Sequence, residues 1–518
     1  MKDVFAPAVG VLLMMGLLVT PAVQAGDLHA LIVGIDRYAT LTPLRGAVND
    51  ARDIEQTIAS FKPKTMKVLV DDQAHRRATL SAWDEIEAKA KPGDTIFVSY
   101  AGHGAQVAEA VPGQEDDGYD EIWALGGFSD SGPGSFERIV DDEWGERISR
   151  VKGIKVIMLL DACHSGTMTR SAYSEAPLWP SRFGGRFEKI EDDALPPPPP
   201  RPDDQTGARP NEIYIGGVAD DRKVPEIDIG GQPRGALSYY FSRGLRGPAD
   251  LNQDGQITFS ELQQYLVENV RQRTESQQTP VIQSGGSPEQ PIFRVSPLQA
   301  SAIPLRPVRV AVRGASASEA ERMTQQLTRV QSTRLSDAEL VWDLGRGRVL
   351  SQAGDWVANA RSAAEMQGEV DKSTALMRLR ALAESRHFGA RLAGGDHRRG
   401  AGERVTLTFE PRKEPYLTII NLAGTGVVNL LYPIYTAESQ PLTPNRLFTL
   451  PPLRVQPPYG ADHVIAIASR NEPTRLRAAL AALEGHRAAD QAVNLIEQAV
   501  TQGGQQIAIV GLFTGDQK

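Results

Sequence analysis

A histidine and the only cysteine of the chain each follow an apolar run with the character of a buried strand. Residues 95–100 lead into Ala101-Gly102-His103-Gly104, and residues 154–160 lead into Asp161-Ala162-Cys163. A histidine beside a cysteine can take the thiol proton and leave a nucleophilic thiolate. The main-chain N–H groups of Gly104 and Cys163 are candidates for an oxyanion hole in acyl transfer. The sequence therefore predicts a cysteine–histidine dyad.

The elements around these residues alternate between strand and helix from Leu28 to about Val295. Such alternation, with nearly continuous apolar strands, predicts an α/β fold with a mainly parallel sheet flanked by helices. Catalytic groups of open α/β sheets collect beyond the carboxyl ends of the strands. Because both motifs follow strands, we expect them to meet at one edge of this sheet.

The 518 residues suffice for two to four domains. We expect the first domain over residues 26–298, with a proline-rich flexible loop at 173–211. A small α/β accessory region follows at 303–390. Alternating apolar residues predict a β-rich, sandwich-like domain at 399–518. The last domain loosely resembles a domain of unknown function found in bacterial proteins.

The N-terminus has the features of a targeting segment. Residues 1–25 contain an apolar run that is shorter than the ~20 residues of a membrane span. The run ends at Val23-Gln24-Ala25, a small-x-small cleavage pattern. We expect a signal peptide, with an uncleaved anchor as the alternative, and an exported, periplasmic or secreted protein without a membrane span after cleavage. With 56 basic and 64 acidic residues, the net charge of −8 gives no reason to expect a nucleic-acid partner.

The motifs between Leu28 and Val295 together resemble the caspase-like cysteine peptidases, and most closely the metacaspases, including bacterial forms. The resemblance rests on six segments: Gly34-Ile35-Asp36, Leu44-Arg45-Gly46 with Asn49-Asp50, residues 100–104, residues 117–121, residues 139–143 and residues 161–166. It implies a caspase-like fold in which His103 is the general base and acid and Cys163 the nucleophile.

The resemblance also places Asp50 and Asp161 in the pocket for the residue before the cleaved bond. Two carboxylates in a partly desolvated pocket favour arginine or lysine and repel aspartate. The alternative is that Asp50 caps a helix and Asp161 caps a turn. This chain has Ala101 and Ala47 where metacaspases often have serine and cysteine, so the pocket lacks polar contacts that are common in the family.

Two segments carry calcium signals. The family's site is matched by Asp120, Asp141 and Asp142, although Arg170 replaces a further expected acid. Its alternative is a solvated acidic loop. Independently of the family, residues 250–261 fit an EF-hand loop. The expected oxygen ligands of this loop are Asp250, Asn252, Asp254, Gln256, Thr258 and Glu261. An Asx-rich turn that caps the following helix is the alternative here.

The sequence thus predicts an exported cysteine endopeptidase that forms an acyl-enzyme and cuts protein or peptide substrates after arginine or lysine, with calcium dependence and self-processing as further expectations. In this family the 173–211 loop is often cut by the enzyme itself, and Arg182, Arg186 and Lys189 are the candidate sites. An uncut linker is the alternative. The competing hypothesis is a catalytically silent caspase-fold scaffold that binds partners through its calcium loop and C-terminal domains.

Overall fold

The computed structural model describes most of the chain after the expected targeting segment. The described residues are 26–110, 113, 117–163, 180–191, 195, 211–217, 224–229, 231–251, 254–274, 278–295, 306–352, 354–393, 398–411, 414–434, 440–443 and 446–515. The expected signal peptide, Asn252, Arg170 and much of the 173–211 loop lie outside them. Among the described helices, none combines the length and apolar composition needed to cross a membrane.

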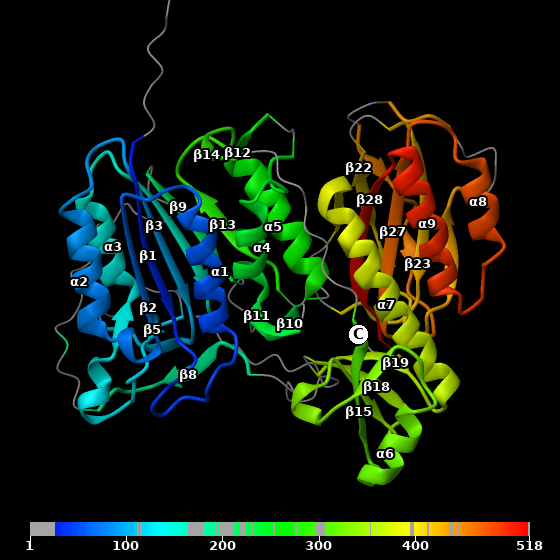
Figure 1. The fold of residues 1–518 in the computed structure, drawn as a ribbon, viewed down its shortest axis with the longest axis horizontal. Coiled ribbons are helices and arrows are strands. Elements are labelled where there is room, and N and C mark those ends of the chain that lie inside the picture. The colour runs from blue at the N-terminus through cyan, green and yellow to red at the C-terminus, as the bar shows by residue number, and fades with distance from the viewer. Residues whose placement is uncertain are drawn as a thin grey trace, which may run out of the picture.

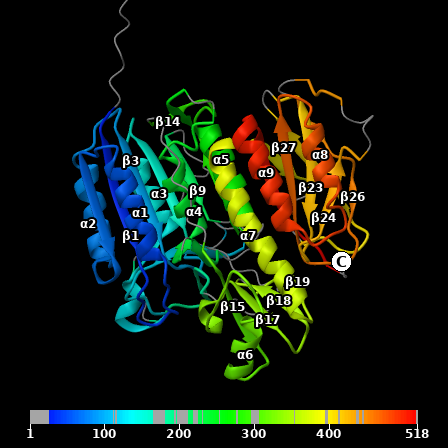
Figure 2. The ribbon, with the colours of Figure 1, turned by 45° about the vertical axis from the view of Figure 1, so that its right-hand side comes forward.

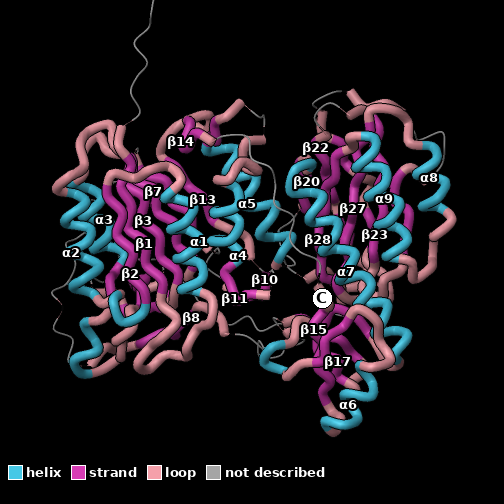
Figure 3. Tube along the Cα trace, in the orientation of Figure 1, coloured by secondary structure: helices cyan, strands magenta, loops and turns pink. Residues whose placement is uncertain are grey.

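The first domain contains a six-stranded central sheet in the order β13-β9-β7-β3-β1-β2 (Figures 1 and 3). Its strands are β1 (Leu28–Gly34), β2 (Thr65–Val70), β3 (Thr95–Ala101), β7 (Lys155–Asp161), β9 (Glu212–Gly216) and β13 (Val281–Ser284). All neighbours pair in parallel except β13 with β9. The predicted α/β class with a mainly parallel sheet is confirmed.

Helices cover both faces of this sheet, which explains why its strands are apolar on both sides. In β1, Ala30 and Ile32 belong to one core and Leu31 and Val33 to the other. The first core includes residues of α1 (Ala47–Ala59), α4 (Ala236–Gly244) and α5 (Phe259–Arg273). The second includes residues of α2 (Arg76–Glu87) and α3 (Asp141–Arg150).

Smaller sheets extend the first domain. One has the order β6-β5-β4-β8, and two strand pairs are β10-β11 and β12-β14. Their bounds are β4 (Gly104–Ala108), β5 (Tyr119–Ala124), β6 (Arg138–Val140), β8 (Phe183–Phe187), β10 (Glu226–Ile229), β11 (Gln232–Gly235), β12 (Gln256–Thr258) and β14 (Pro291–Arg294). Strand β8 lies inside the segment that the sequence predicts to be a flexible loop. That prediction is wrong for residues 183–187, because β8 pairs with β4.

The accessory region contains a five-stranded sheet, here called the accessory sheet, in the order β16-β15-β17-β18-β19. Its elements are β15 (Val308–Arg313), α6 (Ala317–Thr324), β16 (Val330–Ser332), β17 (Leu340–Asp343), β18 (Arg348–Ser351), β19 (Trp356–Asn359) and α7 (Ala363–Arg386). Helix α7 contributes Met366 and Val370 to the core of this sheet and Leu376 and Leu379 to the next core along the chain. It therefore joins the accessory sheet to the C-terminal region.

The C-terminal region is built on a sheet of order β24-β23-β27-β28, with a three-stranded sheet β20-β22-β25 nearby. Its elements are β20 (Gly389–Leu392), β21 (Arg404–Val405), β22 (Leu407–Glu410), β23 (Tyr416–Leu422), β24 (Val428–Tyr432), β25 (Phe448–Thr449), β26 (Leu453–Arg454), β27 (Ala461–Ser469), α8 (Thr474–Ala481), α9 (Ala489–Gly503) and β28 (Gln506–Phe513).

The sandwich-like prediction for this region holds for one face of its main sheet. Val464 and Ala466 of β27 pack with residues of β20 and β22, as in a sandwich. Ile465 and Ile467 instead pack with α7, α8 and α9. Figure 2 shows α7 and α9 side by side in front of this sheet. The β-rich character is confirmed, and the helical layer on the second face is an addition.

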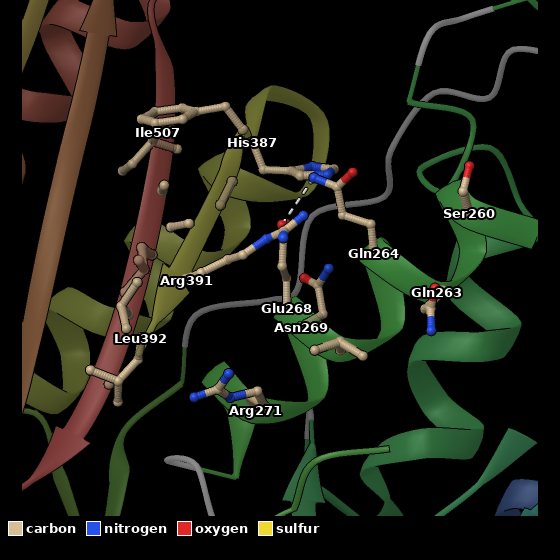
Figure 4. Close-up of a pocket in the computed structure, with 18 residues that line it drawn as sticks. Ser260, Gln263, Gln264, Glu268, Asn269, Arg271, His387, Arg391, Leu392 and Ile507 are labelled. Carbon is tan, nitrogen blue, oxygen red and sulfur yellow. Dashed lines mark hydrogen bonds between the residues drawn. The ribbon is translucent and has the colours of Figure 1, made fainter. Parts of the chain in front are cut away.

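The first domain contacts the C-terminal region through α5. The rings of Tyr265 and His387 lie 6.0 Å apart, edge to face. Beside them lies a cavity of about 500 Å³ between α5 and strands β20 and β28. Figure 4 shows Gln264 and Glu268 on the α5 side, joined by a hydrogen bond of 3.0 Å, and Arg391 on the other side. The cavity is not lined by any residue of the predicted dyad or its acidic pocket.

Candidate active site

Neighbouring strands bring the two chemically reactive motifs to one edge of the central sheet. Strands β3 and β7 pair in parallel, with Ala101 opposite Asp161. His103 and Cys163 each lie two residues beyond this pair, and both are almost completely buried. The equal spacing explains how the sequence places a base and a thiol at the same level of the sheet.

The chain's own Arg182 occupies the space in front of these residues. The N–H groups of Gly104 and Cys163 both donate to the carbonyl oxygen of Arg182, at 3.0 and 3.2 Å. These are the two donors that the sequence nominates for an oxyanion hole. Two N–H groups that converge on one carbonyl oxygen polarise it and stabilise the negative charge that nucleophilic attack would create there.

The side chain of Arg182 extends into a pocket of three carboxylates. Its Nη1 lies 3.3 Å from Asp161 and also donates to the carbonyl oxygen of Asp161 at 3.0 Å. Its Nη2 pairs with Asp50 and lies 3.3 Å from Glu226. All four side chains are fully buried. The structure therefore brings together the two predicted pocket acids and adds Glu226, which the sequence analysis did not identify.

Main-chain N–H groups hold each carboxylate in place. Gly235 donates to Asp50 at 2.9 Å, and Ser238 of α4 donates to Asp161 at 2.8 Å. Both Glu226 oxygens accept bonds of 2.8 Å from the residues that precede α1, Arg45 and Gly46. A side chain at Gly235 would collide with Asp161, so this pocket wall requires glycine. The acids are fixed by the fold in positions that suit a guanidinium.

Burial and charge act against each other in this pocket. Burial raises the pKa of Asp50 to about 8, although the charge of Arg182 opposes the rise and that of Asp161 adds to it. Burial likewise raises the pKa of Glu226. Burial lowers the pKa of Arg182, but the three carboxylates outweigh it and raise this pKa well above its ordinary value. The pocket thus stabilises a positive charge strongly.

The residues up to Arg182 bind as an added strand. The N–H of Arg182 donates to the carbonyl of Val224 at 2.9 Å, and the N–H of Glu226 donates to the carbonyl of Pro180 at 3.1 Å. Ser181 lies opposite Pro225 in antiparallel register. After Arg182, strand β8 pairs in parallel with β4. Residues 180–182 therefore lie as an extended peptide whose last carbonyl, that of Arg182, lies against the N–H groups of Gly104 and Cys163.

The contacts of His103 set which of its ring nitrogens is basic. Its Nε2 lies 2.7 Å from the carbonyl oxygen of Thr42. A carbonyl can only accept, so Nε2 carries the proton and Nδ1 is left as the basic nitrogen. Among the described residues Nδ1 has no hydrogen-bond partner. Tyr38 holds this residue in place, because its hydroxyl accepts the main-chain N–H of His103 at 2.8 Å and its ring lies 4.7 Å from the imidazole.

Burial lowers the pKa of His103 to about 4. The hydrogen bond with Thr42 opposes this shift, and the positive charge of Arg182 adds to it. The imidazole is therefore neutral at neutral pH. A main-chain carbonyl such as that of Thr42 has no signature in a sequence, so this contact could not have been found by motif.

The other two cleavage candidates lie away from the pocket. Arg186 in β8 donates two hydrogen bonds to Gln106, at 2.9 and 2.6 Å, and stacks over Tyr119 at 4.2 Å. Lys189 follows β8 and is exposed. Of the three basic residues named from the sequence, Arg182 is the one whose carbonyl and side chain both occupy the site.

Comparison with protein-family models matches residues 29–171 to the metacaspase, peptidase C14 domain. Residues 29–171 of the first domain fit the caspase-like metacaspase family. A metacaspase (III c) of Phaeodactylum tricornutum is 32% identical over 163 residues, which cover 30% of this chain and 47% of that protein. Metacaspase-1 of Saccharomyces cerevisiae is 31% identical over 160 residues, covering 29% and 36%. The chain therefore spans less than half the length of these curated relatives.

Two further similarities concern other parts of the chain or the fold as a whole. Residues 400–472 match a domain of unknown function (DUF4384). A solved structure of pro-sf-caspase-1 aligns with 51% of this chain and 89% of its own, at 12% identity and a TM-score of 0.32. That TM-score is too low to identify a fold by itself. The assignment of the metacaspase domain rests on the sequence match.

The calcium positions of the metacaspase family lie close to one another in the fold. Asp120 is in β5, and Asp141 and Asp142 form the first turn of α3 directly after β6. Strands β5 and β6 pair, so these acids share one end of the small sheet. One Asp120 oxygen accepts the N–H of Ala110 at 3.0 Å. Within the described ranges, no group of three or more His, Cys, Asp or Glu side chains is arranged as a metal site.

The EF-hand-like loop follows α4 and runs into the first turn of α5. Asp250 accepts the N–H groups of Asp254 and Gly255, at 3.1 and 2.9 Å, and Asp254 accepts that of Gln256 at 2.8 Å. Glu261 forms a capping box with Thr258 at the start of α5. These hydrogen bonds are those expected of a turn that caps α5, the alternative interpretation of this segment. To bind a calcium ion, the carboxylates would have to give up some of these hydrogen bonds.

Proposed function

We propose that the chain is an exported cysteine endopeptidase that cuts after arginine and processes itself at the Arg182–Phe183 bond. The observation that carries the proposal is the position of Arg182. Its carbonyl oxygen accepts N–H bonds from Gly104 and Cys163 while its guanidinium lies among Asp50, Asp161 and Glu226. This is the arrangement expected of a substrate bound for acyl transfer.

The chemistry follows from these contacts. His103 Nδ1 takes the thiol proton, and Cys163 Sγ attacks the carbonyl carbon of Arg182. The resulting oxyanion is stabilised by the N–H groups of Gly104 and Cys163. The amide nitrogen of Phe183 leaves as an amine with the proton from His103, and a thioester remains. Water then attacks the thioester, gives its proton to His103 and releases the carboxylate, after which the thiol is restored.

Peptide cleavage tests the first part of this proposal. We expect fluorogenic peptides ending in Arg to be cut, those ending in Lys about ten-fold or more less efficiently, and those ending in Asp not at all. The reason is that different acids contact the two terminal nitrogens of Arg182: Asp161 lies beside Nη1 and Glu226 beside Nη2. The single ammonium group of lysine cannot make both contacts. The measurement is kcat/KM on chain already cut after Arg182. Cys163→Ala serves as control, and activity in that variant contradicts the proposal.

Self-processing should tolerate acid unusually well. His103 must be neutral to take the thiol proton, and in the uncut chain its pKa lies at about 4 against an ordinary 6.5. We therefore expect the rate of the internal cut to stay nearly level from pH 7 to pH 5 and to fall as the pH passes through about 4. The pH profile of the single-turnover cut, measured after rapid pH jumps, tests this. If the rate instead falls as the pH passes through about 6.5, burial does not lower the pKa of His103.

Calcium binding at residues 250–261 and at the family positions is part of the proposal. It is supported by the oxygen ligands of the loop and by the shared end of the small sheet that carries Asp120, Asp141 and Asp142. A bound ion would supply positive charge that holds these acids together. We expect chelator to lower the melting temperature by several degrees. In Glu261→Gln this decrease should be smaller, by the amount that calcium binding to residues 250–261 contributes. Identical melting with calcium and with chelator contradicts calcium binding.

Export and the role of the remaining domains complete the proposal. Export is supported by the apolar run and the small-x-small pattern within residues 1–25. Cell fractionation, with the mature N-terminus determined by mass spectrometry, tests it. Protein or peptide substrates follow from the peptidase family. We further propose that the C-terminal domain binds a protein partner, since it contains none of the site residues.

A further inference from the structure

The accessory sheet docks on the strand that binds residues 180–182 (Figure 1). The buried carboxylate of Asp228 in β10 pairs with Arg306 and, at 2.8 Å, with Arg309. Arg45, whose main-chain N–H binds Glu226, pairs with Asp337 at 3.0 Å. The accessory region is therefore anchored both to β10 and to the residues before α1 that hold Glu226.

Gln352, directly after β18, inserts its side chain at the edge of β10. Its Nε2 donates to the carbonyl oxygen of Glu226 at 3.2 Å, and its Oε1 accepts the N–H of Asp228 at 3.3 Å. The side chain is buried. In an antiparallel pairing, alternate residues of a strand present both their N–H and their C=O groups to the same neighbour. Gln352 thus occupies main-chain groups on the edge that pairs with Pro180 and Arg182.

The register shows which residues of a bound peptide these groups would serve. Val224 accepts from Arg182, and Glu226 donates to Pro180, the third residue before the cleaved bond. The next main-chain groups along the edge are the carbonyl of Glu226 and the N–H of Asp228. In a bound peptide, the N–H of the third residue would bind the Glu226 carbonyl, and the carbonyl of the fifth residue would bind the Asp228 N–H. Arg273 already donates to the Asp228 carbonyl. The side chains of Gln352 and Arg273 therefore occupy the main-chain groups of β10 that would bind a peptide beyond its third residue.

Proline at position 180 fits this closure because it has no N–H to donate. We propose that Gln352 is a specificity-determining residue: it limits main-chain recognition to three residues before the cleaved bond and selects a third residue without an N–H, such as proline. This inference rests on the proposed peptidase function. A residue with an N–H at the third position has to compete with Gln352 for the carbonyl of Glu226.

Three peptide amides that differ only at the third residue test the proposal. They are acetyl-Pro-Ser-Arg, acetyl-Ala-Ser-Arg and acetyl-(N-methyl-Ala)-Ser-Arg, each with a coumarin leaving group, on full chain cut after Arg182. We expect kcat/KM for the proline and N-methyl peptides to exceed that for the alanine peptide by about three- to ten-fold, the effect of one hydrogen bond. In Gln352→Ala this ratio should fall to about one.

Gln331→Ala is the matched control, because Gln331 is an exposed glutamine in β16 of the same sheet. It should keep the wild-type ratio. A ratio that is unchanged in Gln352→Ala overturns the proposal. So does a preference for proline that the N-methyl peptide does not share, since that preference would reflect ring shape and not the missing N–H.

A measurement without catalysis separates this inference from the peptidase function. If no peptide is cut, the proposed function fails, and the contact of Gln352 is then tested by amide hydrogen exchange on the full-length Cys163→Ala chain. Adding Gln352→Ala should speed exchange at Asp228 by about ten-fold or more, while Glu226, which is bonded to Pro180, stays protected. Equal exchange at Asp228 in both chains overturns the proposal.

Discussion

The Arg182→Gln chain should remain uncut at the bond between residues 182 and 183, with the rate of the internal cut lowered at least about 100-fold. Losing one partner of a buried ion pair costs about 3–5 kcal/mol, and a factor of ten corresponds to about 1.4 kcal/mol. In the Arg182 pocket the loss is of this kind, because three buried carboxylates face one guanidinium. Glutamine keeps much of the length of the side chain but not its charge. Intact-mass measurement over time gives the rate.

Arg186→Gln and Lys189→Gln are the matched controls for this prediction. Both remove a positive charge from the same segment, but Arg186 contacts Gln106 and Tyr119, and Lys189 is exposed. The internal cut should proceed in both variants at nearly the wild-type rate, with Phe183 as the new N-terminus. A cut after residue 186 or 189 in wild-type chain would show that the structure presents the wrong bond to the dyad.

The parts of the site that could be predicted are those set by local sequence. His103 and Cys163 follow strands whose apolar runs are unmistakable, and the parallel register of β3 and β7 then brings the two residues together. Asp50 and Asp161 were named by family resemblance, and Asp161 ends the same strand that positions Cys163. In each case the residue lies within a few positions of an element that the sequence already indicates.

The parts that could not be predicted depend on contacts between distant segments. Glu226 enters the pocket because the β10-β11 hairpin folds against α1, where Arg45 and Gly46 bind its carboxylate. Arg182 was named as a cleavage candidate together with two other basic residues, and only the pairing with Val224 and Glu226 distinguishes it. The glycines and charges of residues 180–191 indicate a loop, whereas β4 provides the partner that makes part of it a strand.

The accessory and C-terminal regions show the same limit on a larger scale. Alternating residues in the C-terminal region predict strands, and β22 and β23 lie where that alternation is found. They could not say what covers each face, because Ile465 and Ile467 pack as well on a helix as on a second sheet. The contact of Gln352 with β10 is likewise invisible in the sequence, since a polar residue after a strand normally indicates an exposed turn.

Asp161→Asn should lower kcat/KM for arginine peptides by about 100- to 4,000-fold. Asparagine can still accept the N–H of Ser238, which Asp161 accepts at 2.8 Å, so the loop should keep its position. What is lost is the negative charge 3.3 Å from Nη1 of the bound arginine, between two fully buried side chains. Breaking such a buried pair costs about 3–5 kcal/mol, which corresponds to the stated loss. Initial rates with arginine and glutamine peptides give the two values.

Asp72→Asn is the control, because it makes the same chemical change at an acid whose side chain is 86% exposed. An exposed ion pair contributes about 0–1 kcal/mol, so this variant should cut arginine peptides like wild type. The peptide ending in glutamine sharpens the comparison. In Asp161→Asn the preference for arginine over glutamine should shrink by the same factor as kcat/KM, since the lost charge acts on the guanidinium alone. If both peptides lose activity equally, Asp161 serves the position of Cys163 and not the recognition of arginine.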